Sequence, residues 1–134
     1  MTMLNLLIAI LQILFGIGSI GFWIYFLLVE NRDPEKTEVY LVFERSFILP
    51  DIAWAAPCSF ISAAGLLTNQ GFWVFFSIAA GSAILFLFLL DFSFNIQQGY
   101  YKKEKRKENI LEIIVNILCL IGGPLFMLYG FFNL

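Results

Sequence analysis

The chain has 134 residues, of which 60% are hydrophobic and only 13% are charged. A soluble domain carries about 25% charged residues, and a soluble domain of this length cannot hide so much apolar surface from water. The formal net charge of −2 argues against a nucleic-acid partner, because binding a polyanion needs an extended basic surface. Composition therefore predicts one small membrane domain, whose main partner is the lipid bilayer.

Four long apolar segments follow one another along the chain, at residues 4–29, 46–67, 72–96 and 110–134. A bilayer core of ~30 Å needs about 20 helical residues, so each segment is long enough to cross it once. The first segment has no basic residues before it and is too long for a secretory signal, so we expect it to be a span. We predict an all-α fold, namely an integral membrane bundle of four transmembrane helices.

The segments are connected by a short polar turn and two charged loops. The turn at residues 68–71 is so short that the second and third spans must form an antiparallel hairpin. The two loops, at residues 30–45 and 97–109, contain all eight Lys and Arg residues. Since successive spans reverse direction, both loops face the same side, and basic loops remain in the cytoplasm. We expect a multi-pass protein of the cell membrane, with both termini outside the cytoplasm.

The first charged loop contains a predicted amphipathic helix. Asp33 followed by Pro34 is typical of a helix N-cap and its first helical position. Apolar residues then recur at helical spacing, opposite Glu38 and Glu44, at Val39, Tyr40, Phe43 and Phe47. We expect this helix to lie in the membrane interface, with the two glutamates on its polar face and a turn near Pro50. The alternative is that these residues are an early start of the second span.

Two aspartates lie inside predicted spans, each near the cytoplasmic end. Asp51 belongs to the second span and Asp91 to the third, and folding the hairpin about residues 69–70 brings them within about one turn in depth. A charge at the bilayer centre costs ~2.5–3.5 kcal/mol on insertion scales, less near the interface. Acids in this position usually point into the bundle and mark a functional site.

Each span has one narrow face of small and polar residues, which is typical of faces where helices pack together. In chain order the four faces contain Asn5, Gln12 and Ser19; Asp51, Ala55, Cys58, Ser62 and Gly65; Ser77, Gly81, Ile84, Phe88, Asp91 and Asn95; and Glu112, Asn116, Cys119 and Gly123. If these faces converge, four polar residues surround one cytoplasm-facing cavity: Asp51, Asp91, Asn95 and Asn116. We expect its walls to be aromatic, from Trp54, Phe88, Phe92 and Phe94.

Several hypotheses account for this cavity. In the first, the aspartates form a site for a proton, a metal cation or an amine-bearing molecule; we expect a small cationic or amphipathic ligand, whose exchange for protons drives transport. In the second, the acids are structural: Asp91 pairs with Arg45, and Asp51 caps the helix that restarts after Pro50. In the third, the two acids perform acid–base chemistry on a lipid or isoprenoid, although no nucleophile or phosphate clamp accompanies them.

A hypothesis of another class is that the protein is an accessory subunit of a larger membrane complex, or a homo-oligomer, and contacts its partners through helix faces.

No cofactor or metal is indicated, because the chain has no His. Its two cysteines, Cys58 and Cys119, have neither a metal-binding nor a redox spacing. Aromatic residues near the span ends are typical of interfacial anchors: Trp23, Tyr25, Tyr100, Tyr101 and Tyr129.

Residues 49–54 read LPDIAW, residues 91–95 read DFSFN, and Gly99 and Tyr100 follow shortly after. These motifs resemble motifs in small four-span prokaryotic membrane proteins of unknown function, which are loosely similar to the DoxX-like group. The resemblance covers the second and third spans and implies the four-helix fold. It places Asp51, Trp54, Asp91, Asn95 and Tyr100 at matching motif positions.

Overall fold

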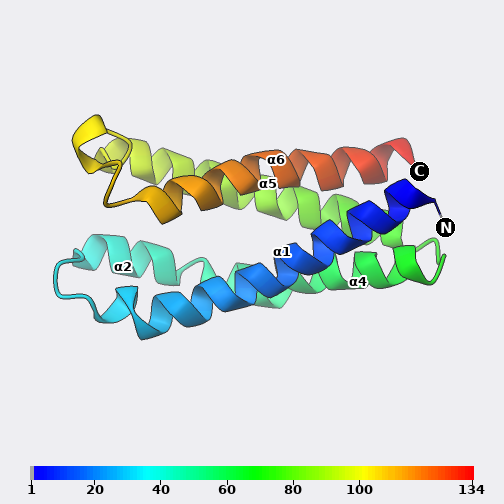
Figure 1. Ribbon diagram of the computed structural model, residues 1–134, viewed down its shortest axis with the longest axis horizontal. Coiled ribbons are helices and arrows are strands. Elements are labelled where there is room, and N and C mark those ends of the chain that lie inside the picture. Colours follow the sequence, from blue (N-terminus) through cyan, green and yellow to red (C-terminus); the bar gives the residue numbers. More distant parts are fainter. Residues whose placement is uncertain (1) are drawn as a thin grey trace.

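The computed structural model describes residues 2–134 and confirms the all-α fold, a bundle of four long helical runs (Figure 1). Each run is long and apolar enough to cross a membrane: Met3–Arg32, Glu38–Leu67, Trp73–Gln98 and Ile110–Phe132. The helices within them are α1 (Met3–Leu28), α2 (Glu38–Arg45), α3 (Ile48–Pro50), α4 (Ala56–Leu67), α5 (Trp73–Gln98) and α6 (Ile110–Phe132). These runs indicate a multi-pass membrane protein.

The two charged loops lie at one end of the bundle, and the chain ends and the 68–72 turn lie at the other (Figure 1). We name the first the basic end, since all eight Lys and Arg residues lie in its loops or in α2 beside them. Residues 2–29, 52–90 and 113–134 contain no charged side chain. The other end is therefore named the uncharged end.

The segment before the second span differs from the prediction at its start. Helix α2 begins at Glu38, and its N-cap is Thr37, whose hydroxyl accepts a hydrogen bond from the backbone N–H of Tyr40 at 3.2 Å. The predicted N-cap at Asp33 is wrong, because this side chain instead accepts from the backbone N–H of Glu35 at 2.9 Å. An aspartate that bonds the backbone two residues further on closes a turn rather than a helix start.

Helix α2 continues into the second span with only residues 46–47 between it and α3. An early start of the second span therefore describes this segment better than a separate interfacial helix. Beyond Pro50 the helix widens into a π-helical turn, η2 (Asp51–Ala55), in which the N–H of Ala56 donates to the carbonyl of Asp51. Pro57 follows directly, and the wide turn relieves the clash of its ring with the carbonyl four residues earlier.

Helices α5 and α6 pack with their backbones in close approach. A Cβ atom added at Gly81 would lie 2.3 Å from the backbone nitrogen of Met127 and 2.4 Å from the carbonyl oxygen of Gly123. The small residues of the predicted faces thus allow this contact, as is common between membrane helices. Pro124 lies inside α6 without ending it.

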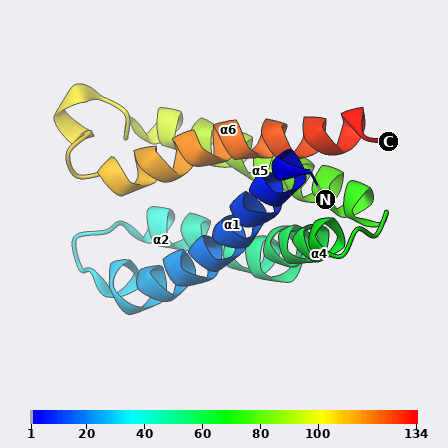
Figure 2. The same cartoon turned by 45° about the vertical axis from the view of Figure 1, so that its right-hand side comes forward.

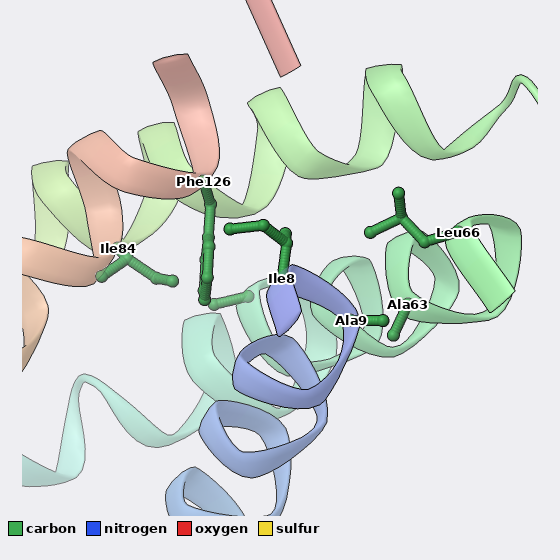
Figure 3. Packing of buried hydrophobic residues seen from close by; sticks show 7 residues of the cluster. Ile8, Ala9, Ala63, Leu66, Ile84 and Phe126 are labelled. Carbon is green, nitrogen blue, oxygen red and sulfur yellow. The ribbon is translucent and has the colours of Figure 1, made fainter. Parts of the chain in front are cut away.

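The core joins α1 to the other helices in the half of the bundle nearer the uncharged end. Figure 3 shows Ile8 of α1 beside Phe126 of α6, and Ala9 beside Ala63 of α4. A buried polar link adds to this contact: the side-chain amide of Gln12 donates to the Ser77 hydroxyl at 3.0 Å, which donates to the carbonyl of Phe126 at 2.8 Å.

Toward the basic end, α1 and α6 separate. The helices pack as two pairs, α1 with α4 and α5 with α6, and the pairs are joined through α4 and α5. Figures 1 and 2 both show α1 running away from α6 as it approaches the basic end. All four long helices therefore pack together near the uncharged end, whereas near the basic end they form two pairs, α1 with α4 and α5 with α6.

The Gly81 contact predicts a stability difference between two glycine variants. Gly81→Ala should lower the free energy of unfolding by about 1–3 kcal/mol, because the added methyl group forces two backbones apart. Gly122→Ala should be neutral or slightly stabilising, since a Cβ there meets no heavy atom within 4 Å. Denaturation of detergent-solubilised protein, followed by circular dichroism, measures both, and equal midpoints would contradict the close packing.

Candidate functional site

Three carboxyl groups meet inside the bundle near its basic end. Glu44 comes from α2, Asp91 from α5 and Glu112 from α6, and each offers an oxygen within 4.8 Å of the others. We name these three residues the acidic cluster. Only 3% of the Glu44 surface is exposed, and Glu112 is also buried. The cluster is compact enough for its oxygens to contact one cation together.

Two amides and a phenol support the cluster from the side of α5 and α6. Asn95 lies one turn after Asp91, and its Nδ2 lies 3.4 Å from Asp91 Oδ2, 3.2 Å from Glu112 Oε1 and 3.0 Å from the Tyr101 hydroxyl. Its two hydrogens are thus shared among three acceptors. Asn116 also donates to the Tyr101 hydroxyl. Burial raises the pKa of Tyr101, so its hydroxyl keeps its proton.

Several oxygens in and beside the cluster have no hydrogen-bond donor within residues 2–134. These atoms are Glu44 Oε1, Asp91 Oδ1 and Asn95 Oδ1. All three are acceptors, and a buried acceptor without a donor costs about 1–3 kcal/mol. The site therefore lacks donors, which is the kind of group that a cation or a proton supplies.

No basic side chain in the described part of the chain pairs with the cluster. The two ion pairs there lie nearer the surface, with Lys36 Nζ 3.6 Å from Glu30 and Arg45 Nη2 3.5 Å from Glu38. Three carboxyl groups this close cannot all be ionised unless a cation neutralises them. In the absence of a cation, the cluster must hold protons.

The acidic cluster forms one wall of a cavity of about 240 Å³. Asp51 and Asn116 add polar groups to the lining, and the rest is mostly apolar, with Phe22 and Trp23 from α1 and Phe88 from α5. The cavity thus combines a strongly acidic region with a larger apolar surface. Such a surface favours a ligand that has both a charge and a hydrophobic part.

Asp51 is held differently from the acidic cluster. Its Oδ2 accepts a hydrogen bond of 2.8 Å from the indole N–H of Trp23, a buried residue of α1. The prediction that Trp23 is an interfacial anchor is therefore wrong. Asp51 itself ties α1 to the second span, rather than capping the helix after Pro50 as the structural hypothesis expects.

The other half of the structural hypothesis also fails. Arg45 does not pair with Asp91, because its Nη1 donates to Asn31 Oδ1 at 2.6 Å and its Nη2 faces Glu38. Helix α2 directs Arg45 toward the neighbouring loop and Glu44 into the bundle. Asp91 is thus left with two other acids as its charged neighbours.

The six predicted ligand-contact residues divide into three groups. The cavity brings together four of them, namely Asp51, Asp91, Asn116 and Phe88. Asn95 is completely buried behind the cavity wall, where it supports the acidic cluster. Trp54 is 49% exposed and lies outside the cavity. In the π-helical turn each residue advances by a smaller rotation, so Trp54 does not return to the face of Asp51.

The other two predicted wall residues also lie outside the cavity. Phe94 stacks on Phe43 of α2, with ring centroids 3.9 Å apart and an angle of 13° between the rings. Phe92 packs against Tyr101, with ring centroids 5.7 Å apart. Both rings therefore attach flanking segments to α5 rather than line the binding space.

Sequence reasoning missed Glu44 and Glu112 as site residues. Glu112 gave a usable signal, because it lies one turn before Asn116 on the predicted polar face of its span. The helical spacing of residues 38–47 is misleading for Glu44, because it predicts that this residue lies on the polar side of an amphipathic helix. Helix α2 instead buries the face formed by Tyr40, Leu41 and Glu44.

No protein-family model, curated protein or solved structure matches the chain. The resemblance to the DoxX-like group therefore stays a prediction. The function must be argued from the acidic cluster and its cavity.

The uncompensated cluster predicts that removing one acid stabilises the protein when no ligand is present. Glu44→Gln should raise the free energy of unfolding at pH 8 by about 1 kcal/mol, because a neutral amide removes the cost of either protonating this acid or burying its charge, and it supplies donors. Glu38→Gln is the control, since Glu38 is exposed and forms only a surface ion pair. Thermal unfolding in detergent compares the variants with the parent, and a clear loss of stability in Glu44→Gln would contradict the prediction.

Proposed function

We propose that this protein binds a small organic cation in its cavity and exchanges it for protons. The acidic cluster holds the cationic group, and the apolar walls hold the hydrophobic part. The single observation that carries the proposal is a buried group of three carboxyls that faces a mostly apolar cavity and has no basic partner within residues 2–134. A ligand that supplies the missing charge relieves the cost of this burial.

An organic cation fits the cavity better than a bare metal ion. Mg²⁺ and Ca²⁺ take six or more oxygen ligands, including water, and gain nothing from an apolar wall. An aromatic lining such as that of Phe22, Trp23 and Phe88 favours organic ammonium groups through cation–π attraction and apolar contact. The volume of about 240 Å³ lies just below the ~300–1,000 Å³ of pockets for drug-sized ligands, so the enclosed part of the ligand is small.

Proton exchange follows from the same carboxyl groups. When the cation leaves, three adjacent acids cannot all remain charged, so protons must take its place. We place the protein in the cell membrane with the basic end in the cytoplasm, because basic loops are retained on that side. The cavity then takes up and releases its ligand in the cytoplasmic half of the bilayer, and a proton gradient can drive the exchange.

Binding of 2-phenylethylammonium, a small amine with an aromatic body, tests the proposal. Isothermal titration calorimetry in lipid nanodiscs should detect binding to the parent protein. Asp91→Asn and Glu44→Gln should each weaken this binding at least tenfold, or about 1.4 kcal/mol, because each removes one charge that faces the ligand.

Glu38→Gln is the matched control for this experiment, because it removes an acid from the same helix as Glu44 without touching the cavity. Its affinity should equal that of the parent. If the parent does not bind the amine, or if all three variants bind it equally well, the assignment of the cavity is wrong.

Proton exchange predicts a specific pH dependence. Protons compete with the cation for the same carboxylates, so the affinity for 2-phenylethylammonium should fall as the pH is lowered. Titrations in buffers of different ionisation enthalpy should show protons released on binding, and Asp91→Asn should release fewer. Binding that releases no protons at any pH would leave a cation site but remove the exchange.

A further inference from the structure

We infer that the ligand is a single-chain amphiphile with a primary ammonium head, and that it enters from the bilayer between α1 and α6. This inference rests on the proposed function and names its ligand class and route. It is carried by the separation of the two helices, by the exposed edge of the cavity and by the donors that the acidic cluster lacks.

The gap between the backbones of α1 and α6 widens toward the basic end (Figures 1 and 2). Near the uncharged end the two helices are joined, because the Tyr129 hydroxyl donates to Asn5 and the rings of Phe15 and Phe126 meet edge to face at 6.4 Å. Beyond these contacts α1 runs away from α6 and along α4 instead (Figures 1 and 2). The two helices are therefore apart in the half of the bundle that contains the acidic cluster.

Cavity-lining residues on both sides of this gap reach the outer surface of the bundle. Leu14 of α1 is 58% exposed and Leu118 of α6 is 64% exposed, although both line the cavity. Gly18 also lines it, and a Cβ added there would meet no heavy atom within 4 Å. In a membrane these surfaces face lipid, so the cavity opens sideways into the hydrocarbon region.

The acceptor oxygens that lack a donor indicate which head group of a ligand fits the acidic cluster. Glu44 Oε1 and Asp91 Oδ1 belong to cavity-lining residues and have no donor within residues 2–134. A primary ammonium offers three N–H donors and a positive charge, which matches both requirements. A quaternary ammonium offers the charge but no donor, and would leave these oxygens unpaired.

The dimensions of the cavity indicate that the hydrocarbon chain of the ligand extends into lipid. Six residues of α6 separate Glu112 in the acidic cluster from Leu118 at the exposed edge, a rise of about 9 Å. A chain longer than this passes the edge while its head remains at the cluster. The enclosed volume is then needed only for the head and the first carbons, which agrees with its small size.

The first test compares dodecylammonium with dodecyltrimethylammonium, which share one chain and differ in donors. Both are titrated into phosphatidylcholine nanodiscs, and emission of the cavity residue Trp23 is followed in a Trp54→Phe, Trp73→Phe background. The primary amine should bind at least tenfold more tightly. Equal affinities would overturn the head-group assignment, and nanodiscs without protein correct for partition into lipid.

The second test places a large side chain between α1 and α6. Gly18→Phe should weaken dodecylammonium binding at least tenfold, because the ring occupies the open side of the cavity. Gly21→Phe is the matched control, since Gly21 is on the same helix and equally open but does not line the cavity. Equal affinities of these two variants would overturn the route between the helices.

The third test locates the chain. A dodecylammonium with a photoreactive diazirine at its tail should label α1 near Leu14 and α6 near Leu118, and excess dodecylammonium should prevent this. Protected labelling confined to residues 29–47 or 99–109 would place the chain at the basic end and overturn the inference. If 2-phenylethylammonium still binds to the cavity in that case, the proposed function stands. If instead no protected labelling is found and neither amine binds, both proposals fall.

Discussion

Three carboxyl groups are buried together near the basic end, and no basic side chain within residues 2–134 pairs with them. Removing ions from water costs several kcal/mol each, even after the protein relaxes. Asn95 offsets part of that cost, but its two hydrogens serve three acceptors. The remaining cost must be offset by protons or by a cation. A bundle needing only stability would fill this space with apolar side chains at lower cost, and this cost is the reason for proposing a binding site here.

The close packing of the core and the cavity lie in different halves of the bundle. Near the uncharged end, Ile8, Phe126 and the Gln12–Ser77 link hold α1 against α5 and α6. Near the basic end, α1 follows α4 and leaves α6, so the cavity opens where the acids lie. The close α5–α6 contact through Gly81 and Gly123 keeps Asp91 and Glu112 in register. Close packing at one end thus permits an open, charged site at the other.

Sequence patterns predicted the parts of this fold that bilayer thickness and charge determine. Span length gave the four helices, and helical spacing placed Asp91, Asn95 and Asn116 on interior faces. Two parts were not predictable in this way. The π-helical turn after Pro50 changes the rotation of the second span, which moved Trp54 out of the cavity. Burial of Glu44 depends on how α2 docks, and amphipathic spacing within α2 cannot reveal an acidic partner on α5 or α6.

The two aspartates singled out by the sequence have different environments, and this difference determines where a ligand's charge belongs. Asp51 already accepts a hydrogen bond from the indole N–H of Trp23, and it is not one of the three residues of the acidic cluster. Asp91 faces Glu44 and Glu112 and retains an oxygen without a donor. A cation gains more where it faces several carboxylates than where it faces one that is already bonded. The proposed ligand would therefore place its charged head at the acidic cluster, while Asp51 and Trp23 hold α1 beside the apolar part of the cavity.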